Sequence, residues 1–537
     1  MPANLKKNGG VAPPLEAHTS RNGRMHKSIL NAEVSLLFYF LSLFFAFFSR
    51  KIFLSNLGDD FIGLTGTLSN ILGYLNLAEL GIGTSVSYFL YKPLQQNDHA
   101  SINNILSVFG YLYRWIGILI LGFGVLVSII FPFIFKNESL GLGIVYFSFY
   151  SILGSCLIGY FINYRQILLS ADQKNYLVAV YTQSAGIVKT ILQIYFAYAY
   201  KNLFVWVSIE FLFGVVACII LNWKINKEYP WLACDKSKGR MLMKDYPEIW
   251  IKTKQVFVHK LKYFILGKSD ELFIFAFVSL KMVTYYGNYM MIVSKVVTMF
   301  VLALNNVGAS VGNLIAEGNK ANTMKVFWEL SAIRYFIAGI VCFSLFCLIE
   351  PFISLWLGAE YVLPRSTLML LLSYFYINIS QGAVDSFIYG YGIYGDTWSA
   401  WTELVINLTI TLIAGYYMGI NGILLGKIVS TFLITLLWKP YYLFLAGLKE
   451  SYINYWKKTI RYHLIFVATA LPVYLFLNHL PVIAGSSYLA WGFGSLISVV
   501  TYCALNIPLY LLFAPGSKDL LRRVNLRKIL SRVSIIK

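Results

Sequence analysis

Ionisable side chains interrupt several long apolar segments of this sequence. The basic ones are Arg50, Lys51, Lys189, Lys268, Lys295 and Lys427, and the acidic ones are Glu79, Glu210, Asp270, Glu271, Asp385 and Glu403. A charge at the centre of a bilayer-spanning helix costs roughly 2.5–3.5 kcal/mol on insertion scales, so it normally faces a watery cavity or a partner. These residues are therefore the first candidates for a functional site.

The basic group predicts an anion site. Several cations gathered in a cavity with apolar walls suit a phosphate or pyrophosphate, and the candidates are Arg50, Lys189, Lys268 and Lys295. Two alternatives stay open. A Lys near a helix end, such as Lys51 or Lys427, can extend its stem to the membrane interface. Lys268 and Asp270 could instead take part in a purely structural ion pair.

The acidic group predicts a site for a coupling cation, either H⁺ or Na⁺. Its candidates are Asp270, Glu403, Asn407 and Glu79. Glu403 and Asn407 are four residues apart and lie on one face of a helix. A surface-facing Glu403 near the cytoplasmic end of that helix is the simpler alternative.

The composition decides what kind of fold must position these residues. Of the 537 residues, 58% are apolar and 13% are charged, and the mean hydropathy is +0.65. A soluble protein carries about 25% charged residues. A soluble enzyme, a nucleic-acid-binding protein and a disordered scaffold are therefore poor interpretations, although the formal charge is +20. We expect an all-α protein with many membrane-spanning helices.

Fourteen apolar runs are long enough to cross a bilayer, which takes roughly 20 residues. They begin near residues 34, 62, 108, 143, 176, 203, 255, 284, 332, 367, 399, 422, 462 and 486. With the N-terminus inside, 34 of the 44 Lys and Arg residues, Arg334 among them, fall on the cytoplasmic side, and 6, including Arg365, fall on the outer side. This asymmetry predicts that both termini are cytoplasmic.

The spacing of the runs predicts two six-helix bundles, over 30–224 and 255–446, followed by two helices within 447–515. A cytoplasmic connection spans 225–254, and the ends are an N-terminal tail over 1–29 and a basic tail over 516–537. YLVAVYTQ (176–183) superimposes weakly on DTWSAWTE (396–403). Such a shift by an even number of crossings indicates parallel repeats about an axis normal to the membrane.

Three further kinds of signal are missing from the sequence. The six cysteines have no CxxC spacing and the six histidines are scattered, so we expect no metal site. No cleaved signal peptide is recognisable at the start. No GxxxxGK[ST] loop occurs, which argues against ATP as the energy source, and we expect no cofactor.

Four segments carry a family resemblance. Residues 50–93 read RKIFLSNLGDDFIGLTGTLSNILGYLNLAELGIGTSVSYFLYKP, and the others are YRQILLSADQKNY (164–176), GKSDELFIF (267–275) and YYGNYMMIVSKV (285–296). Together with the helix layout they resemble the bacterial polysaccharide (O-antigen type) flippases over residues 30–515. Within the first segment, Gly58 and Gly63 are expected to allow a tight turn after the first helix.

The resemblance implies the fold of the multidrug/oligosaccharidyl-lipid/polysaccharide exporter superfamily. It also implies a flippase that moves polyprenyl-pyrophosphate-linked oligosaccharide across the bacterial cytoplasmic membrane by alternating access, rather than an enzyme. The expected partners are that lipid-linked substrate, the lipid bilayer and other polysaccharide-assembly membrane proteins, without nucleic acid. A multidrug exporter of the same fold is the alternative, and a membrane-embedded glycan polymerase or ligase is a weaker one because the outer loops are short.

Overall fold

The computed structural model describes residues 15–76, 82–136, 140–245, 267, 269–305, 311, 314–315, 317–393, 396–479 and 487–523. Their regular secondary structure is helical throughout. The chain divides into two compact units. The first comprises residues 1–61 and 71–261, and the second comprises residues 62–70 and 262–537.

Ten helices in the described residues are long and apolar enough to cross a membrane. The chain is therefore an all-α polytopic membrane protein. The predicted number of fourteen spans stays a prediction, because the run near residue 255 lies mostly outside the described residues. Three other predicted runs form the helices α2 (Asp59–Leu75), α12 (Leu280–Asn305) and α17 (Thr397–Met418), which are not among the ten.

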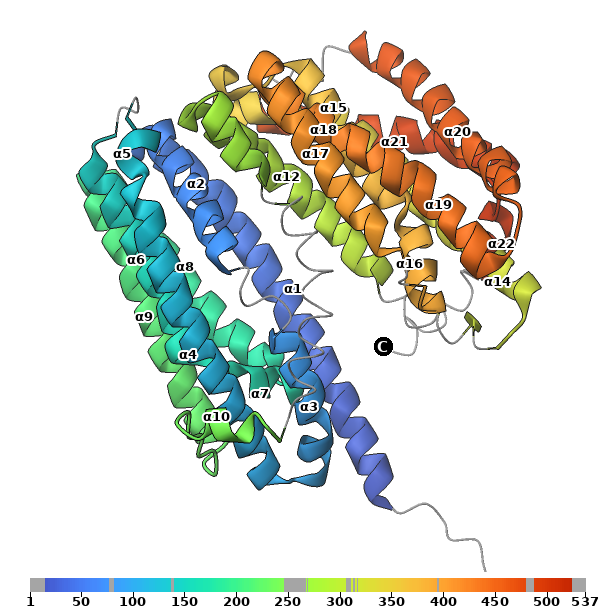
Figure 1. Ribbon diagram of the computed structural model, residues 1–537. Helices are drawn as coiled ribbons and strands as arrows, with labels where there is room; N and C mark the ends of the chain where they lie inside the picture. Colours follow the sequence, from blue (N-terminus) through green and yellow to red (C-terminus); the bar gives the residue numbers. More distant parts are fainter. Residues whose placement is uncertain are drawn as a thin grey trace, which may run out of the picture. The chain divides into compact units, whose positions relative to one another are not determined.

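The first unit is built from long helices that pack side by side (Figure 1). These are α1 (Leu15–Leu57), α4 (His99–Ile129), α6 (Leu142–Phe161), α8 (Asn175–Tyr200) and α9 (Leu203–Glu228), with α3 (Ile82–Gln96) as a shorter one. Short segments complete it: α5 (Phe131–Ile134), η2 (Asn163–Arg165), α7 (Gln166–Ala171) and α10 (Gly239–Leu242). Contacts run from α1 to α8, then to α9, α6 and α4.

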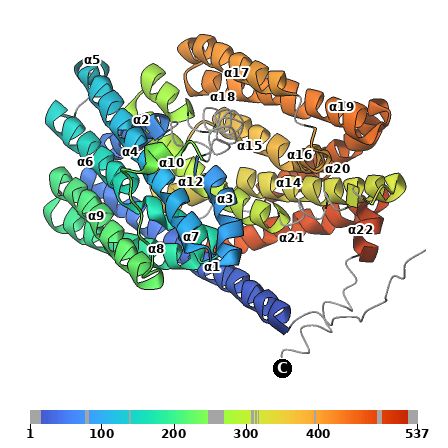
Figure 2. The same ribbon diagram turned by 60° about the horizontal axis from the view of Figure 1, so that its bottom comes forward.

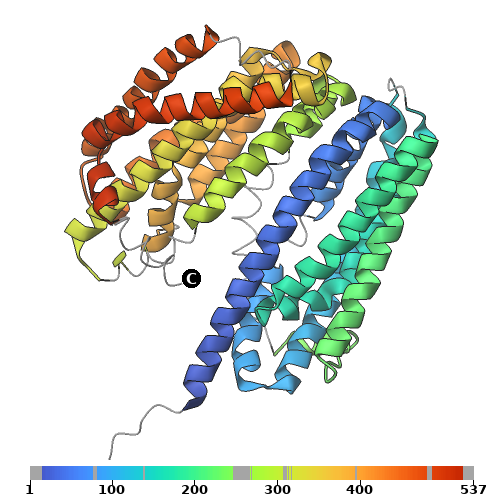
Figure 3. The same ribbon diagram turned by 180° about the vertical axis from the view of Figure 1, so that it is seen from behind.

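The long helix α1 runs along α8, as Figure 3 shows from behind. A polar link fixes the start of this contact. The Asn31 side chain donates to the Gln173 carbonyl at 2.8 Å and accepts from the Tyr176 backbone N–H at 2.6 Å. The Asn31 side chain thereby satisfies one of the amides that the first turn of α8 leaves without an intrahelical partner.

The predicted cytoplasmic connection begins later than expected, because α9 continues to Glu228. Its first part folds back onto the first unit. The backbone N–H of Asp235 donates to Ser107 at 2.9 Å, and Lys236 donates to the Phe161 carbonyl at 2.6 Å while lying over the Tyr164 ring. Residues 229–245 are therefore an ordered cover on this unit rather than a free linker.

The second unit contains α12, α14 (Lys320–Trp356), α15 (Arg365–Ser380), α16 (Gly382–Tyr391), α17, α18 (Ile420–Thr431), α20 (Tyr452–Asn478) and α21 (Tyr488–Phe513). The shorter elements are η3 (Ala359–Tyr361), η4 (Phe432–Trp438), α19 (Lys439–Tyr442), η5 (Leu443–Leu448) and α22 (Ser517–Arg523). In Figure 2, α14 runs between α15–α16 and α21, and it contacts all three. Helices α20 and α21 also pack on each other, so the last two helices join the second unit's core.

The two glycines expected to form one turn have different roles. Gly58 has φ +87° and links α1 to α2, as the turn requires. Gly63 instead lies within α2, where an added Cβ would approach the Leu280 carbonyl oxygen to 2.2 Å. Gly63 is therefore needed for the close packing of α2 against the start of α12. Small residues commonly allow such close approach between membrane helices.

One face of α20 presents an apolar stripe at helical spacing, with Ile460, Leu464, Leu471 and Leu475 each more than half exposed. An exposed apolar surface of this length is not stable against water. Lipid is the medium that such a face requires.

Candidate functional site

Lys189 of α8 forms an ion pair with Glu210 of α9 in the first unit, at 2.6 Å. Gln193 lies one turn further along α8 and donates to the other Glu210 oxygen at 2.9 Å. Both charged side chains remain partly exposed, at 24% and 32%. The structure thus gives Lys189 the partner that a charge within a membrane helix needs, and its three potential donors are not all used by Glu210.

Asp270 and Lys427 form a buried ion pair in the second unit, and their side chains are 8% and 5% exposed. The Tyr286 hydroxyl donates to the same Asp270 Oδ2 at 2.6 Å. The Lys427 ammonium also lies over the Tyr374 ring, 4.6 Å from its centre. The interpretation that Lys427 reaches toward the membrane interface is therefore wrong, because its helix turns it into the interior of the unit.

Glu271, the neighbour of Asp270, accepts a hydrogen bond from Asn70 of α2 at 2.6 Å. Since residues 62–70 belong to the second unit, this contact lies within that unit. Asp270, Glu271, Asn70 and Tyr286 line a cavity of about 290 Å³. Asp270 therefore contacts the buried Lys427 ammonium, and Asp270 and Glu271 both border the cavity.

Glu403 and Asn407 lie on the same face of α17, and both are about 97% buried. The alternative of a surface-facing Glu403 is therefore excluded. Thr435 of η4 donates to Glu403 at 3.4 Å. The close packing of α17 on α18 explains the burial, because a Cβ on Gly426 would come within 2.3 Å of the Thr411 hydroxyl.

The remaining predicted site residues lie in different units or outside the described residues. Arg50 on α1 and Lys295 on α12 are half-buried, and they belong to different units. Lys268 and Glu79 lie outside the described residues. A common cationic cavity and a common coupling site therefore stay predictions.

Two further basic residues have defined surroundings in the second unit. Lys439 donates to Asp385 at 2.6 Å. Arg334, which the sequence assigned to a cytoplasmic loop, lies within α14 and is 7% exposed. Its guanidinium fits against the backbone of Gly382, where an added Cβ would come within 2.2 Å of Nη1.

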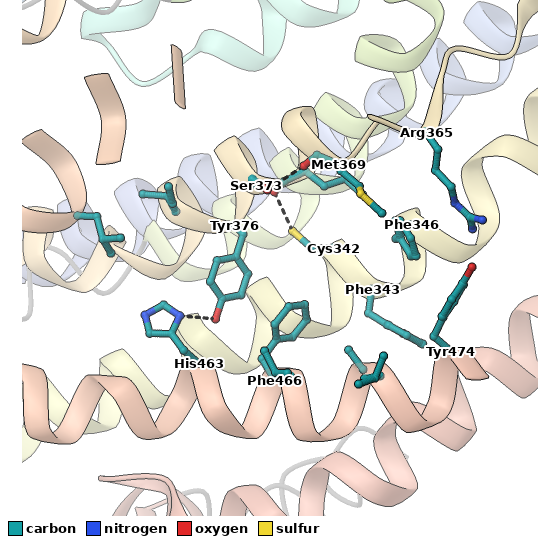
Figure 4. Close-up of a pocket in the computed structure, with 16 residues that line it drawn as sticks. Cys342, Phe343, Phe346, Arg365, Met369, Ser373, Tyr376, His463, Phe466 and Tyr474 are labelled. Carbon is teal, nitrogen blue, oxygen red and sulfur yellow. Dashed lines mark hydrogen bonds between the residues drawn. The ribbon is translucent and has the colours of Figure 1, made fainter. Parts of the chain in front are cut away.

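A larger cavity of about 700 Å³ lies within the second unit between α14, α15, η4 and α20 (Figure 4). Its walls are mostly aromatic and aliphatic. At one end the Arg365 guanidinium lies over the rings of Phe346 and Tyr474, at 4.8 and 5.4 Å from their centres. Further along the cavity the Tyr376 hydroxyl is 3.2 Å from His463 Nδ1.

This cavity combines an apolar interior with a cation at its end. Arg365 is 3.9 Å from Glu350, but its side chain remains 46% exposed, so part of its planar donor array faces outward. Such an arrangement suits an amphiphile with an apolar chain and an anionic group. Guanidinium groups bind phosphate oxygens with two parallel hydrogen bonds more readily than ammonium groups do.

The sequence did not reveal the cavity. Arg365 was counted as an outer-side charge, because it lies just before the apolar run that begins near residue 367. Aromatic residues are common at membrane interfaces, so those around Arg365 carry no specific signal in the sequence. A guanidinium placed between Phe346 and Tyr474 requires three helices to meet, and single-sequence patterns carry no signal for that meeting.

No protein family profile and no curated protein sequence matches this chain. Solved structures, in contrast, match it in fold. The structure of the lipid II flippase MurJ in its inward closed conformation is 13% identical, covers 92% of this chain and 100% of its own, and superimposes with a TM-score of 0.62. An inward-facing multidrug resistance MATE family transporter of the MOP superfamily is 15% identical, covers 78% of this chain and 98% of its own, and has a TM-score of 0.56. The chain therefore shares its fold with these two structures.

Proposed function

We propose that the protein is a flippase that moves a polyprenyl-pyrophosphate-linked oligosaccharide across the bacterial cytoplasmic membrane for surface polysaccharide synthesis. The observation that carries the proposal is the 700 Å³ cavity with Arg365 at its end. Its apolar walls accommodate part of a polyprenyl chain, and Arg365 neutralises a phosphate. The fold shared with a lipid II flippase supports a lipid-linked substrate.

In this proposal Arg50, Lys189, Lys268 and Lys295 contribute further positive charge for the pyrophosphate and sugars during alternating access. Energy comes from a cation gradient, H⁺ or Na⁺, acting on buried acidic groups. Asp270, Glu403 and Asn407 are the described candidates, with Glu79 as a further one. Both termini face the cytoplasm, and other polysaccharide-assembly proteins are the expected partners.

The competing proposal is a multidrug exporter, which the likeness to the MATE transporter favours. A cationic drug requires a carboxylate where it binds. The large cavity instead carries a guanidinium, so a lipophilic cation would meet repulsion there unless Glu350 holds it.

Thermal unfolding of the purified protein separates the two proposals. One arm contains a polyprenyl-pyrophosphate oligosaccharide, and the other contains tetraphenylphosphonium. A ligand at 100 times its dissociation constant stabilises the folded state by about 2.7 kcal/mol. We expect stabilisation by the pyrophosphate lipid alone, weakened in Arg365→Gln but not in the matched control Arg240→Gln of the other unit. Stabilisation by the cation alone would overturn the flippase proposal.

A further inference from the structure

Three basic side chains gather where residues 229–245 cover the first unit. Lys236 donates to the Phe161 carbonyl oxygen at 2.6 Å. Burial lowers the pKa of Lys236, and the nearby positive charges of Arg165 and Arg114 lower it further. The three cations therefore lie close enough to repel one another, and this repulsion opposes the docking of the covering segment.

Neutral groups surround this cluster. Arg165 of η2 donates to the side-chain oxygens of Asn222 and Asn226 at 2.8 and 2.9 Å. These amides orient the guanidinium but do not neutralise it. Lys236 likewise contacts a carbonyl oxygen and the ring of Tyr164. Within the described part of the chain, none of the three cations forms an ion pair with a carboxylate.

Three carboxylates at this end of the unit are already bound to other lysines. Asp235 pairs with Lys238 at 3.8 Å. Asp172 and Glu228 both pair with Lys174, at 2.7 and 3.0 Å. They leave the cluster open to an anion from its surroundings.

Arg114 lies directly before the exposed apolar part of α4. The exposed large apolar side chains of this helix begin at Trp115, which is 56% exposed. Ile118 and Leu121 follow Arg114 at one and two turns on the same face and are exposed too. Because a face of this kind requires lipid, Arg114 is at the level where acyl chains end and phosphate headgroups begin.

We propose that Arg114, Arg165 and Lys236 form a site for the phosphate of an anionic phospholipid. A phosphate supplies the charge that the cluster lacks, and a guanidinium can bind it through two parallel hydrogen bonds. Basic pockets beside membrane-spanning helices suit anionic headgroups for this reason. Inorganic phosphate offers the same charge, but only a lipid also covers Ile118 and Leu121 with its chains. With the N-terminus inside, as the basic residues predict, this lipid belongs to the cytoplasmic leaflet.

A bound headgroup would join the covering segment to the helices beneath it. Lys236 belongs to the segment, whereas Arg114 belongs to α4 and Arg165 to η2. A phosphate among them replaces their mutual repulsion with attraction. Anionic lipid should therefore strengthen the docking of residues 229–245 on the first unit, and with it the thermal stability of the protein.

The test measures thermal unfolding of the purified full-length protein in a neutral detergent with increasing phosphatidylglycerol. Phosphatidylcholine and inorganic phosphate form the comparison arms. We expect stabilisation by phosphatidylglycerol alone. Arg114→Gln should raise the phosphatidylglycerol concentration needed for half-maximal stabilisation about fivefold, which corresponds to one basic residue near an anionic lipid surface. The matched control Arg240→Gln removes an exposed arginine of the same unit outside the cluster, and its midpoint should equal that of the wild type.

Lys236→Met should raise the same midpoint. If this variant undocks the covering segment, the shift in Arg114→Gln still decides, because Arg114 is exposed. Equal stabilisation by phosphatidylcholine or by inorganic phosphate, or equal midpoints in Arg114→Gln and Arg240→Gln, would overturn the inference. No lipid-linked oligosaccharide is present, so failure of the flippase proposal does not affect the result.

Discussion

The buried Asp270–Lys427 pair allows a quantitative test through a double-mutant cycle. Removing one partner of a buried ion pair leaves an uncompensated charge and costs about 3–5 kcal/mol. Both side chains are less than a tenth exposed, so this range applies to Asp270→Asn and to Lys427→Met separately. The double variant leaves two neutral groups of similar size and should cost far less than the sum of the two.

The free energy of unfolding of the four proteins, measured with increasing denaturant in one detergent, gives the coupling between the two sites. The matched comparison is Lys320→Met with Glu450→Gln, because that pair is 54% and 37% exposed. Exposed pairs contribute about 0–1 kcal/mol. Single variants at Asp270 and Lys427 within 1 kcal/mol of the wild type, or a double variant equal to the sum, would refute the reasoning.

Three further outcomes follow from other contacts. Lys189→Ala should abolish surface glycan while the protein stays in the membrane; normal glycan on the cell surface would remove Lys189 from the substrate site. Gly426→Val should destabilise the protein by about 1–3 kcal/mol through overpacking against Thr411, and an unchanged unfolding free energy would contradict that packing. Burial raises the pKa of Cys234 to about 11, so its thiol stays protonated at pH 8. In a variant with Cys234 as the only cysteine, maleimide labelling should rise about tenfold per pH unit toward pH 11, whereas denatured protein, whose thiol pKa is near 8.5, should label faster at pH 8.

Patterns along the sequence predicted the all-α membrane fold, because span length and hydropathy are local properties. They also identified Lys189, Asp270 and Glu403 as residues that need a buried environment or a partner. The partners could not be predicted: Lys189 meets Glu210 across α8 and α9, and Asp270 meets Lys427, which is 157 residues away. Such pairings depend on helix rotation and on which helices are neighbours.

Two buried cations lie near predicted helix ends. Lys427 was expected to reach the membrane interface and Arg334 was counted on the cytoplasmic side, but α18 and α14 turn both side chains into the second unit. Arg334 also lies in a helix that begins earlier than the apolar run near residue 332 indicates, since α14 starts at Lys320. Hydropathy detects where a helix is apolar, not where it begins.

The length of α14 has a consequence for the membrane boundary. Its 37 residues rise about 55 Å at 1.5 Å per residue, whereas the hydrocarbon layer is about 30 Å thick. Even a steep tilt of 40° leaves roughly a quarter of the helix beyond that layer. The Lys320 end is the part suited to water, because Lys320 pairs with Glu450 and Lys325 with Asp519 of α22. The projecting turns thus hold α22 and the connection between η5 and α20 at the edge of the lipid.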